Sequence, residues 1–287
     1  MTSRDVGEQV QKAERLRALH HGDKILVLPN IWDPGGARML EWVGYPAVAT
    51  ASASVAYSLG YDDGQQISLD AMVDVVGRVA SAVSVPVTAD MEWGYGEEPQ
   101  EVAENMRRVL RAGAVGINLE DSVREGERLF PIEFQCERIR AVRAMADEEG
   151  VPLVINARSD VFWPRVPGTD EEKLEEAIRR AKAYLEAGGD CFYPILLGDL
   201  PTLKRIYEAI KAPINVIALT SQASLEELEE AGIARISLGP SLMVASLTVM
   251  RNIAQGLQNY SSFDAFTQDM ISFDDIRAFV RKGPMSG

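Results

Sequence analysis

The sequence predicts an α/β fold, a (β/α)8 TIM barrel followed by a C-terminal helical extension. Short apolar runs rich in β-branched residues recur eight times and alternate with longer amphipathic stretches. Runs that are apolar on both faces indicate buried parallel strands, and intervening helices of about 10–15 residues indicate βαβ units. Eight such units over roughly 220 residues agree with a TIM barrel, which typically takes about 250 residues.

Each strand is an apolar run, and each helix is an amphipathic run between two strands. Glycine follows several of the helices, as expected for helix C-termini. The first turn, Pro29–Gly36, lacks the Gly-x-Gly-x-x-Gly motif of a doubly wound sheet, so the barrel is favoured over that alternative. The predicted strands are Ile25–Pro29, Ala47–Ala51, Val85–Ala89, Val115–Leu119, Pro152–Ala157, Cys191–Leu196, Ile214–Leu219 and Arg235–Leu238, and the predicted helices include Glu8–Gly22, Ala71–Ala82, Pro99–Ala112, Glu133–Glu149, Asp170–Ala187, Pro201–Ile210 and Ser224–Ala231.

The pattern predicts two parts of unequal size. Residues 1–250 form the barrel catalytic domain, and residues 251–287 form a helical tail. Within the tail, Phe263–Met270 and Phe273–Val280 have helical character. We expect the tail to pack on the barrel or on a neighbouring subunit.

Charge and hydropathy exclude several classes of protein. The chain has 29 Lys and Arg against 43 Asp and Glu, a formal net charge of −14. This balance argues against nucleic acid and against an anionic membrane surface, because both require a basic face. No stretch approaches the ~18 apolar residues of a membrane span, and no secretory signal is recognisable at the N-terminus. We therefore expect a cytoplasmic protein.

Cysteine and histidine are too scarce for several kinds of active site. Cys136 and Cys191 cannot supply a disulfide framework or a thiolate metal site, and we expect both to be small core residues. His20 and His21 are adjacent in the N-terminal helical stretch, which excludes a Ser-His-Asp triad and an HExxH zinc site. Catalysis must therefore rest on carboxylates, Arg, Lys, Tyr, Ser or backbone amides, with or without a hard metal ion.

Three carboxylates are predicted to converge at the carboxyl ends of the strands, where TIM barrels carry their active sites. Asp90 and Glu92 are two residues apart, so on an extended strand end they face the same way, and Glu120 ends the next strand. An all-oxygen set suits Mg²⁺, with Mn²⁺ as a substitute. The alternative is that strand-end carboxylates cap helices, and Asp121 is a candidate for that role.

Other residues at these strand ends suit the binding of a carboxylic acid. Arg158 ends the fifth strand and is suited to a bidentate contact with a substrate carboxylate, although an ion pair with Asp160 or Glu120 is the alternative. The small residues after Thr50 expose backbone amides, including that of Ala53, that can hold an oxyanion. Asn215 opens the seventh strand and is a further substrate-binding candidate, and Tyr95 lies in a glycine-flanked turn at the mouth.

With these residues collected, the chain resembles the isocitrate lyase/phosphoenolpyruvate mutase superfamily. The resemblance implies a barrel whose last helix is exchanged between subunits, a homodimer or homotetramer, and the binding of 2-oxo acids or enolates through Mg²⁺. The stretches that carry it are Pro29–Asp33, Val48–Ser54, Ser58–Asp63, Thr88–Gly96, Gly116–Asp121 and Ile155–Arg158.

The resemblance also assigns roles to residues. It implies that Arg158 binds the substrate and that the amides of Ser52 and Ala53 receive its carboxylate or oxo oxygen. Ala51-Ser52 stands where Ser-Gly is usual, and Glu92 stands where a second Asp is usual. Asp62 is an alternative to Asp63 if the loop is offset by one residue. The implied metal and water shell consists of Asp63, Asp90, Glu92 and Glu120.

The segment Ser122–Pro131 departs from the superfamily's best-known lids. It has neither the Lys-Lys-Cys-Gly-His motif of the isocitrate lyases nor the Pro-Lys and Asn of the mutase and phosphonopyruvate hydrolase. We therefore expect a short-lid, Mg²⁺-dependent lyase that cleaves a C–C bond of a small 2-oxo or 2-hydroxy di- or tricarboxylic acid. The alternatives are P–C bond chemistry on phosphonopyruvate and a non-catalytic 2-oxo-acid-binding protein. Candidate proton donors are Tyr95, Ser122, Arg124 and a metal-bound water.

Overall fold

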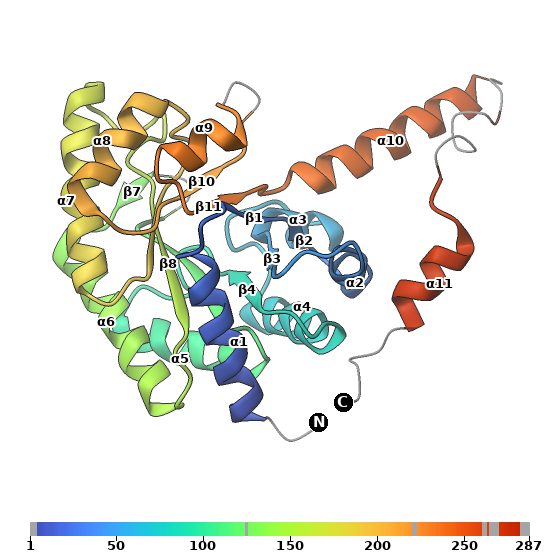
Figure 1. Ribbon diagram of the computed structural model, residues 1–287, viewed down its shortest axis with the longest axis horizontal. Helices are drawn as coiled ribbons and strands as arrows, with labels where there is room; N and C mark the ends of the chain where they lie inside the picture. Colours follow the sequence, from blue (N-terminus) through green and yellow to red (C-terminus); the bar gives the residue numbers. More distant parts are fainter. Residues whose placement is uncertain (1–4, 124–125, 220–222, 260–262, 264–269, 282–287) are drawn as a thin grey trace.

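The computed structural model describes residues 5–123, 126–219, 223–259, 263 and 270–281. Eight strand positions alternate with helices, and their order along the chain is the predicted one (Figure 1). Each predicted strand is confirmed within one or two residues at each end. The strands are β1 (Leu26–Leu28) with β2 (Asn30–Ile31), β3 (Val48–Thr50), β4 (Val87–Asp90), β5 (Gly116–Glu120), β8 (Val154–Ser159), β9 (Cys191–Pro194), β10 (Asn215–Ile217) and β11 (Arg235–Ser237).

The parallel strands pair in a closed ring, as a barrel requires. One sheet has the order β2-β3-β4-β5-β8-β9 and the other has the order β1-β11-β10. An isolated parallel bridge between Phe192 and Ile214 joins β9 to the start of β10. At the other junction β1 and β2 are one strand interrupted at Pro29, which has no N–H to give to a ladder. Pro29 O still accepts from Ala49 N at 3.1 Å, so the pairing continues past the interruption.

Several helices begin at side-chain caps, and several end at glycines. Thr169 and Glu172 form a capping box, as do Ser224 and Glu227, so the first turns of two helices are satisfied by their own side chains. Gly113, Gly150, Gly188 and Gly232 have positive φ just past helix ends, which confirms the predicted stops. The helices between strands are α2 (Pro34–Trp42), α3 (Ser52–Ser58), α4 (Leu69–Ala82), α5 (Pro99–Arg111), α6 (Ile132–Glu148), α7 (Asp170–Glu186), α8 (Leu200–Ile210) and α9 (Leu225–Glu230).

Helix α1 (Val6–Leu19) covers the amino end of the barrel. Its Leu16 is fully buried, and a Cβ placed on Gly116 at the start of β5 would lie 2.7 Å from the Leu16 side chain. Gly116 is therefore needed where α1 approaches the strands. Gln9 Nε2 donates to Leu110 O at 2.8 Å and ties the helix to α5. With this end closed by α1, the opposite end, where the strands finish, is left for a site.

A short hairpin follows β5 in place of a helix. Strands β6 (Ser122–Val123) and β7 (Arg128–Leu129) pair antiparallel, and α6 starts only after Pro131. Asp121 therefore does not cap a helix, and that alternative interpretation of its position is wrong.

The C-terminal part leaves the barrel and returns to it. Figure 1 shows α10 (Ser241–Gln258) extending away from the strands and α11 (Phe273–Arg281) lying back beside α2. The Trp42 and Phe279 rings are 6.1 Å apart, and Arg38 donates to Val280 O. The predicted helix at Phe273–Val280 is confirmed, whereas Phe263–Met270 lies largely outside the described residues. The predicted division after residue 250 falls inside α10.

Within the described part of the chain, no helix is both long and apolar enough to cross a membrane. Cys136 and Cys191 are buried and unbonded to one another, as expected for small core residues.

Replacing Leu16 by Ala tests the closing role of α1. We expect the free energy of unfolding to fall by about 2–5 kcal/mol, because a fully buried leucine leaves a cavity at the barrel end. Urea titration followed by circular dichroism measures the change. Val6→Ala, on the same helix but 40% exposed, is the control and should change stability by less than about 0.5 kcal/mol. Equal effects of the two substitutions would contradict the assignment.

Candidate active site

The strand register brings the predicted polar residues to the barrel interior. Asp90 pairs with Asn118, and Asn118 pairs with Asn156 on the next strand. Toward the carboxyl ends, Glu120 pairs with Arg158. Residues paired across parallel strands point to the same face, so these side chains share the inside of the ring. The predicted convergence of strand-end side chains from β4, β5 and β8 is therefore found.

The Asp90 carboxylate is bound by groups from two elements, α3 and β5. Its Oδ2 accepts from Ser52 N at 3.1 Å and from Ser52 Oγ at 3.0 Å, while its Oδ1 lies 3.4 Å from Asn118 Nδ2. Ser52 and Ala53 open α3 and are both buried. The Ser52 amide, expected to hold a substrate oxygen, is thus engaged by Asp90 in this conformation.

The backbone at Glu92 does not have the extended conformation that the sequence predicted. Strand β4 ends at Asp90, and Glu92 has a φ of +50°, so simple alternation along a strand does not apply. The left-handed backbone turns the chain, and Glu92 O accepts from Glu120 N at 2.9 Å. Burial, together with the charges of Asp63 and Asp90, raises the pKa of Glu92 to about 9.

Of the two aspartates in the loop after α3, Asp63 faces the other carboxylates. Asp62 is exposed, and its carboxylate accepts from Asp63 N at 2.9 Å. Asp63 Oδ1 is buried and has no hydrogen-bond partner among the described residues. Burial and the nearby Asp90 raise the pKa of Asp63. These contacts favour Asp63 over Asp62 as a member of the site.

Arg158 is held between two carboxylates. Its Nη1 lies 2.5 Å from Glu120 Oε1, and its Nε donates to Asp160 Oδ1 at 2.7 Å. Burial alone would lower the pKa of Arg158, but Asp160 and Glu120 raise it well above its usual range. Burial raises the pKa of Glu120, and the Arg158 charge opposes that shift. Glu120 is therefore an ion-pair partner in this structure, as the alternative interpretation of Arg158 proposed.

Tyr95 and Asn215 occupy opposite parts of the site. Tyr95 has a φ of +57°, and its hydroxyl is buried without a hydrogen-bond partner among the described residues. Burial, followed by the charge of Glu92, raises the pKa of Tyr95. Asn215 is fully buried, and its Oδ1 accepts from Ser237 Oγ at 3.2 Å.

The carboxylates do not form a ready-made metal cage. Among the residues that the structure describes, no group of three His, Cys, Asp or Glu side chains is arranged to hold a metal ion. However, burial and the charge of Asp90 raise the pKa of Asp63, and burial and the charges of Asp63 and Asp90 raise the pKa of Glu92. Such mutual repulsion is relieved when a cation enters.

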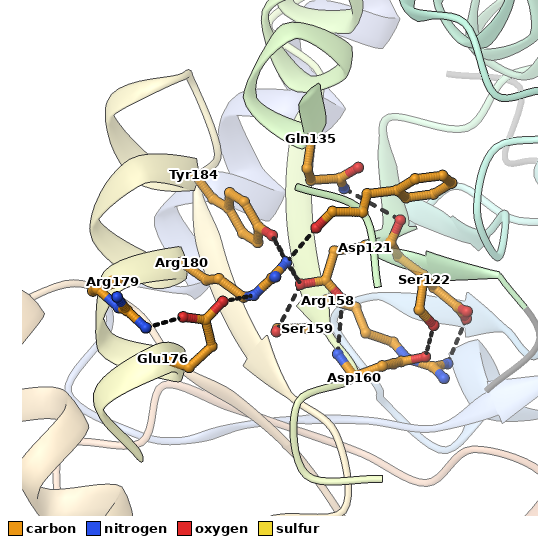
Figure 2. Close-up of polar contacts among 12 residues, drawn as sticks. Asp121, Ser122, Gln135, Arg158, Ser159, Asp160, Glu176, Arg179, Arg180 and Tyr184 are labelled. Atoms are coloured by element: carbon orange, nitrogen blue, oxygen red, sulfur yellow. Dashed lines mark hydrogen bonds and ion pairs between the residues drawn. The ribbon is translucent and has the colours of Figure 1, made fainter. Parts of the chain in front are cut away.

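A buried network behind the site was not anticipated from the sequence. Asp121 accepts from Ser159 Oγ at 2.8 Å, Tyr184 OH at 2.8 Å and Arg180 Nη1 at 3.0 Å (Figure 2). Asp160 N also donates to Asp121 Oδ1, at 2.9 Å. The network joins β5, β8 and α7. Its only signal in the sequence is the acidic pair Glu120-Asp121, which does not identify the partners.

Ser122 belongs to this network and is unsuited to donate a proton to a substrate. Its hydroxyl is fully buried, donates to Asp160 Oδ2 and accepts from Gly126 N at 2.9 Å. Figure 2 shows the side chain of Asp160 lying between those of Ser122 and Arg158. Arg124, another candidate donor, lies outside the described residues.

Replacing Asp121 by Ala tests the network. We expect the free energy of unfolding to fall by about 3–5 kcal/mol, because the buried Arg180 keeps only Glu176 as a carboxylate partner and the Ser159 and Tyr184 hydroxyls lose their acceptor. The measurement is urea titration. Glu171→Ala on the same helix as Arg180 removes an exposed ion pair with Arg205 and should leave stability almost unchanged. A small effect of Asp121→Ala would show that the network is not structural.

The raised pKa of Glu92 predicts how stability depends on pH. Between its ordinary value of 4.5 and its folded value of about 9, the folded protein holds a proton that the unfolded chain has released. Stability of the metal-free protein should therefore fall as the pH rises through this window. Melting temperatures measured in EDTA from pH 5 to about pH 9 should fall less steeply for Glu92→Gln, which cannot titrate. Parallel curves for the two proteins would contradict the shift.

Comparisons with known proteins agree with this geometry. The family described as phosphoenolpyruvate phosphomutase matches residues 16–258. An uncharacterized protein of Mycobacterium tuberculosis is 29% identical over 241 residues, 84% of this chain and 88% of that protein. A 2-methylisocitrate lyase of Aeropyrum pernix is 27% identical over 252 residues, 84% of this chain and 79% of the enzyme.

Solved structures show the same fold. A Burkholderia cenocepacia J2315 protein with a provisional lyase/mutase assignment is 33% identical, with a TM-score of 0.86, and the match covers 96% of this chain and 98% of that one. A second protein of that organism, provisionally assigned as a phosphonomutase, is 37% identical with a TM-score of 0.81, over 88% of this chain and 100% of that one. The chain therefore belongs to the phosphoenolpyruvate phosphomutase family, within the isocitrate lyase/phosphoenolpyruvate mutase superfamily of enzymes.

Proposed function

We propose that this protein is a Mg²⁺-dependent lyase that cleaves a C–C bond of a small 2-oxo or 2-hydroxy di- or tricarboxylic acid through an enolate. The observation that carries the proposal is the set of mutually repelling carboxylates Asp63, Asp90 and Glu92 beside the Arg158–Glu120 pair; Glu92 is buried, and Asp63 and Asp90 are half-buried. Such a set is unfavourable in the protein alone and becomes favourable when a cation and an anionic ligand bind together.

The residues present fit a hard divalent ion. Asp63 offers a buried oxygen without a partner, and Asp90 and Glu92 add further carboxylate oxygens. Mg²⁺ prefers such oxygens and keeps several of its waters, so it does not require a cage of three direct ligands; Mn²⁺ would suit the same oxygens. When bound, the ion would polarise the 2-oxo oxygen and lower the barrier to an enolate.

Arg158 is positioned to bind a substrate carboxylate. Asp160 fixes its Nε and Glu120 engages Nη1, so the plane of the guanidinium is set from two sides. A fixed guanidinium plane favours a bidentate contact with a carboxylate. The amides of Ser52 and Ala53 would assist if Ser52 exchanged its present contact with Asp90 for the ligand.

Tyr95 is the proton donor that we propose for the enolate carbon. Its raised pKa keeps the hydroxyl protonated, and a carbanion-like carbon is basic enough to remove such a proton. Ser122 is committed to Asp160, which removes the other described side-chain candidate.

The relatives support the substrate class and leave one alternative. The names of the curated relatives include 2-methylisocitrate lyase, whose substrate is a tricarboxylic acid. The matching family carries a phosphomutase name and the second Burkholderia protein a provisional phosphonomutase name, which favours phosphonopyruvate chemistry as the second candidate. A third candidate, a protein that binds a 2-oxo acid without turning it over, predicts binding alone.

Calorimetric titration with oxalate, an enolate mimic, tests the proposal. We expect oxalate to bind in the presence of Mg²⁺ and not in EDTA. Asp90→Asn should abolish this binding with the fold intact, whereas Asp62→Asn should leave it unchanged. Tyr95→Phe should bind oxalate and lose turnover.

Absence of oxalate binding by the wild-type protein in both conditions would overturn the metal–enolate proposal. If oxalate binds, turnover of oxaloacetate, 2-methylisocitrate and dimethylmalate should be assayed, with phosphorus NMR of phosphonopyruvate as the test of the second candidate. Binding without turnover of any of these acids would favour the third candidate.

We also propose that the protein is a homo-oligomer, either a dimer or a tetramer. Helix α10 has only Met243 buried, while Val244, Leu247, Val249 and Met250 are each at least 45% exposed. Apolar side chains exposed along one helix are typical of a subunit contact.

Light scattering after size-exclusion chromatography measures the mass. We expect two or four times the chain mass of 31.5 kDa. A charged substitution, Leu247→Glu, should lower the measured mass. Ser246→Glu adds the same charge at the neighbouring position without removing an apolar side chain, and it is the control for added charge. A wild-type mass of one chain would contradict the proposal.

A further inference from the structure

Arg235 is a fully buried arginine whose guanidinium is poorly satisfied by the protein. It opens β11 and pairs in register with Leu26 on β1 and Asn215 on β10. Its Nε donates to Ser237 Oγ at 3.1 Å. Neither Nη1 nor Nη2 has a hydrogen-bond partner among the described residues. Four of the five N–H groups of the guanidinium are thus buried without an acceptor among the described residues.

The side chain is directed toward the active site. Ser237 lies two residues nearer the carboxyl end of β11, so the contact with its hydroxyl draws the guanidinium toward that end of the barrel. Ser237 Oγ in turn donates to Asn215 Oδ1, and Asn215 Nδ2 also lacks a partner within the described part of the chain. Cys191, Tyr193 and Asp90, in that order, act electrostatically on Arg235. Three unpaired N–H-bearing atoms therefore lie beneath the carboxylates of the site.

Arg138, Arg158 and Arg180 each contact acceptors through at least one Nη atom, which sets Arg235 apart. Arg158 and Arg180 each contact carboxylates, at 2.5–2.7 Å and 2.8–3.0 Å respectively. Arg138 is also fully buried, and its Nη atoms donate to Glu120 O, Trp93 O and Gln135 Oε1. An uncompensated buried charge destabilises a fold, so a residue that serves packing alone would be better replaced by an apolar side chain of similar volume.

We propose that Arg235 is a second cationic ligand-binding residue of the site and that, with the Asn215 amide, it receives an anionic oxygen of the bound 2-oxo acid. This inference rests on the proposed function and deepens it. Arg158 on β8 and Arg235 on β11 lie three strands apart in the ring, so they would contact the bound acid from different sides. Two cations directed at one ligand suit a substrate with more than one carboxylate.

A structural role and a ligand-binding role make opposite predictions for Arg235→Met. If the role of Arg235 is to bind a ligand, the apolar substitution should leave the melting temperature of the ligand-free protein unchanged or raise it by about 2–4 °C. It should also weaken Mg²⁺-dependent oxalate binding by about ten- to hundredfold. Arg235→Lys, which keeps the charge, should lose less affinity than Arg235→Met.

Arg138→Met is the matched control for stability. It removes a buried arginine whose Nη atoms are satisfied, so it should lower the melting temperature by leaving the acceptors of Arg138 unpaired. A similar loss of melting temperature in Arg235→Met would identify Arg235 as structural and overturn the inference. Unchanged oxalate affinity in Arg235→Met would overturn it as well, while leaving the proposed function intact. Failure of the wild-type protein to bind oxalate would overturn both.

Discussion

The position of the Arg158 guanidinium between Glu120 and Asp160 is the interaction on which the site depends. Asp160 is held in turn by Ser122 and, through its backbone N–H, by Asp121. Asp121 is anchored by Arg180 and Tyr184 on α7, so contacts run from an outer helix to the barrel interior (Figure 2). Because every member except the half-buried Arg158 is buried, displacement of one leaves a charge or a donor unpaired, which makes the arrangement rigid.

The barrel interior is unusually polar for a packed core. TIM barrels commonly fill this space with branched apolar side chains. Here Asp90, Asn118, Asn156, Arg158 and Arg235 occupy it, with asparagines bridging between strands, as in the 2.7 Å contact from Asn156 Nδ2 to Asn118 Oδ1. Charged and amide side chains thus occupy part of the space that an apolar core would fill, and their mutual contacts preorganise the charges. The outer layer, where the helices pack on the strands, supplies the apolar burial that holds the barrel together.

Family membership and geometry restrict the chemistry in complementary ways. The family places the chain among enzymes whose relatives carry lyase and mutase names. The geometry adds that Glu120 is engaged by Arg158 and that Asp63 and Glu92 retain raised pKa values. Under the proposed function, the carboxylates left to hold a cation would be Asp63, Asp90 and Glu92, and Arg158 beside them would bind the acid. Under the same proposals, Arg235 and Tyr95 would add contacts around this centre.

The sequence by itself determined the fold and most of the members of the site. The alternation of apolar strands and capped helices depends on residues that are neighbours in the sequence. In a parallel barrel the carboxyl ends of all strands lie at one end of the barrel. Asp90, Glu120 and Arg158, which lie at strand ends, could therefore be expected together. Only the tertiary structure decided how they pair. Asp121 meets Arg180 and Tyr184 across 59 and 63 residues of chain, Glu92 turns through a left-handed φ, and Arg235 lies inside the ring without an acceptor among the described residues. Such contacts arise from closure of the ring, which brings distant strands together and has no local signature in the chain.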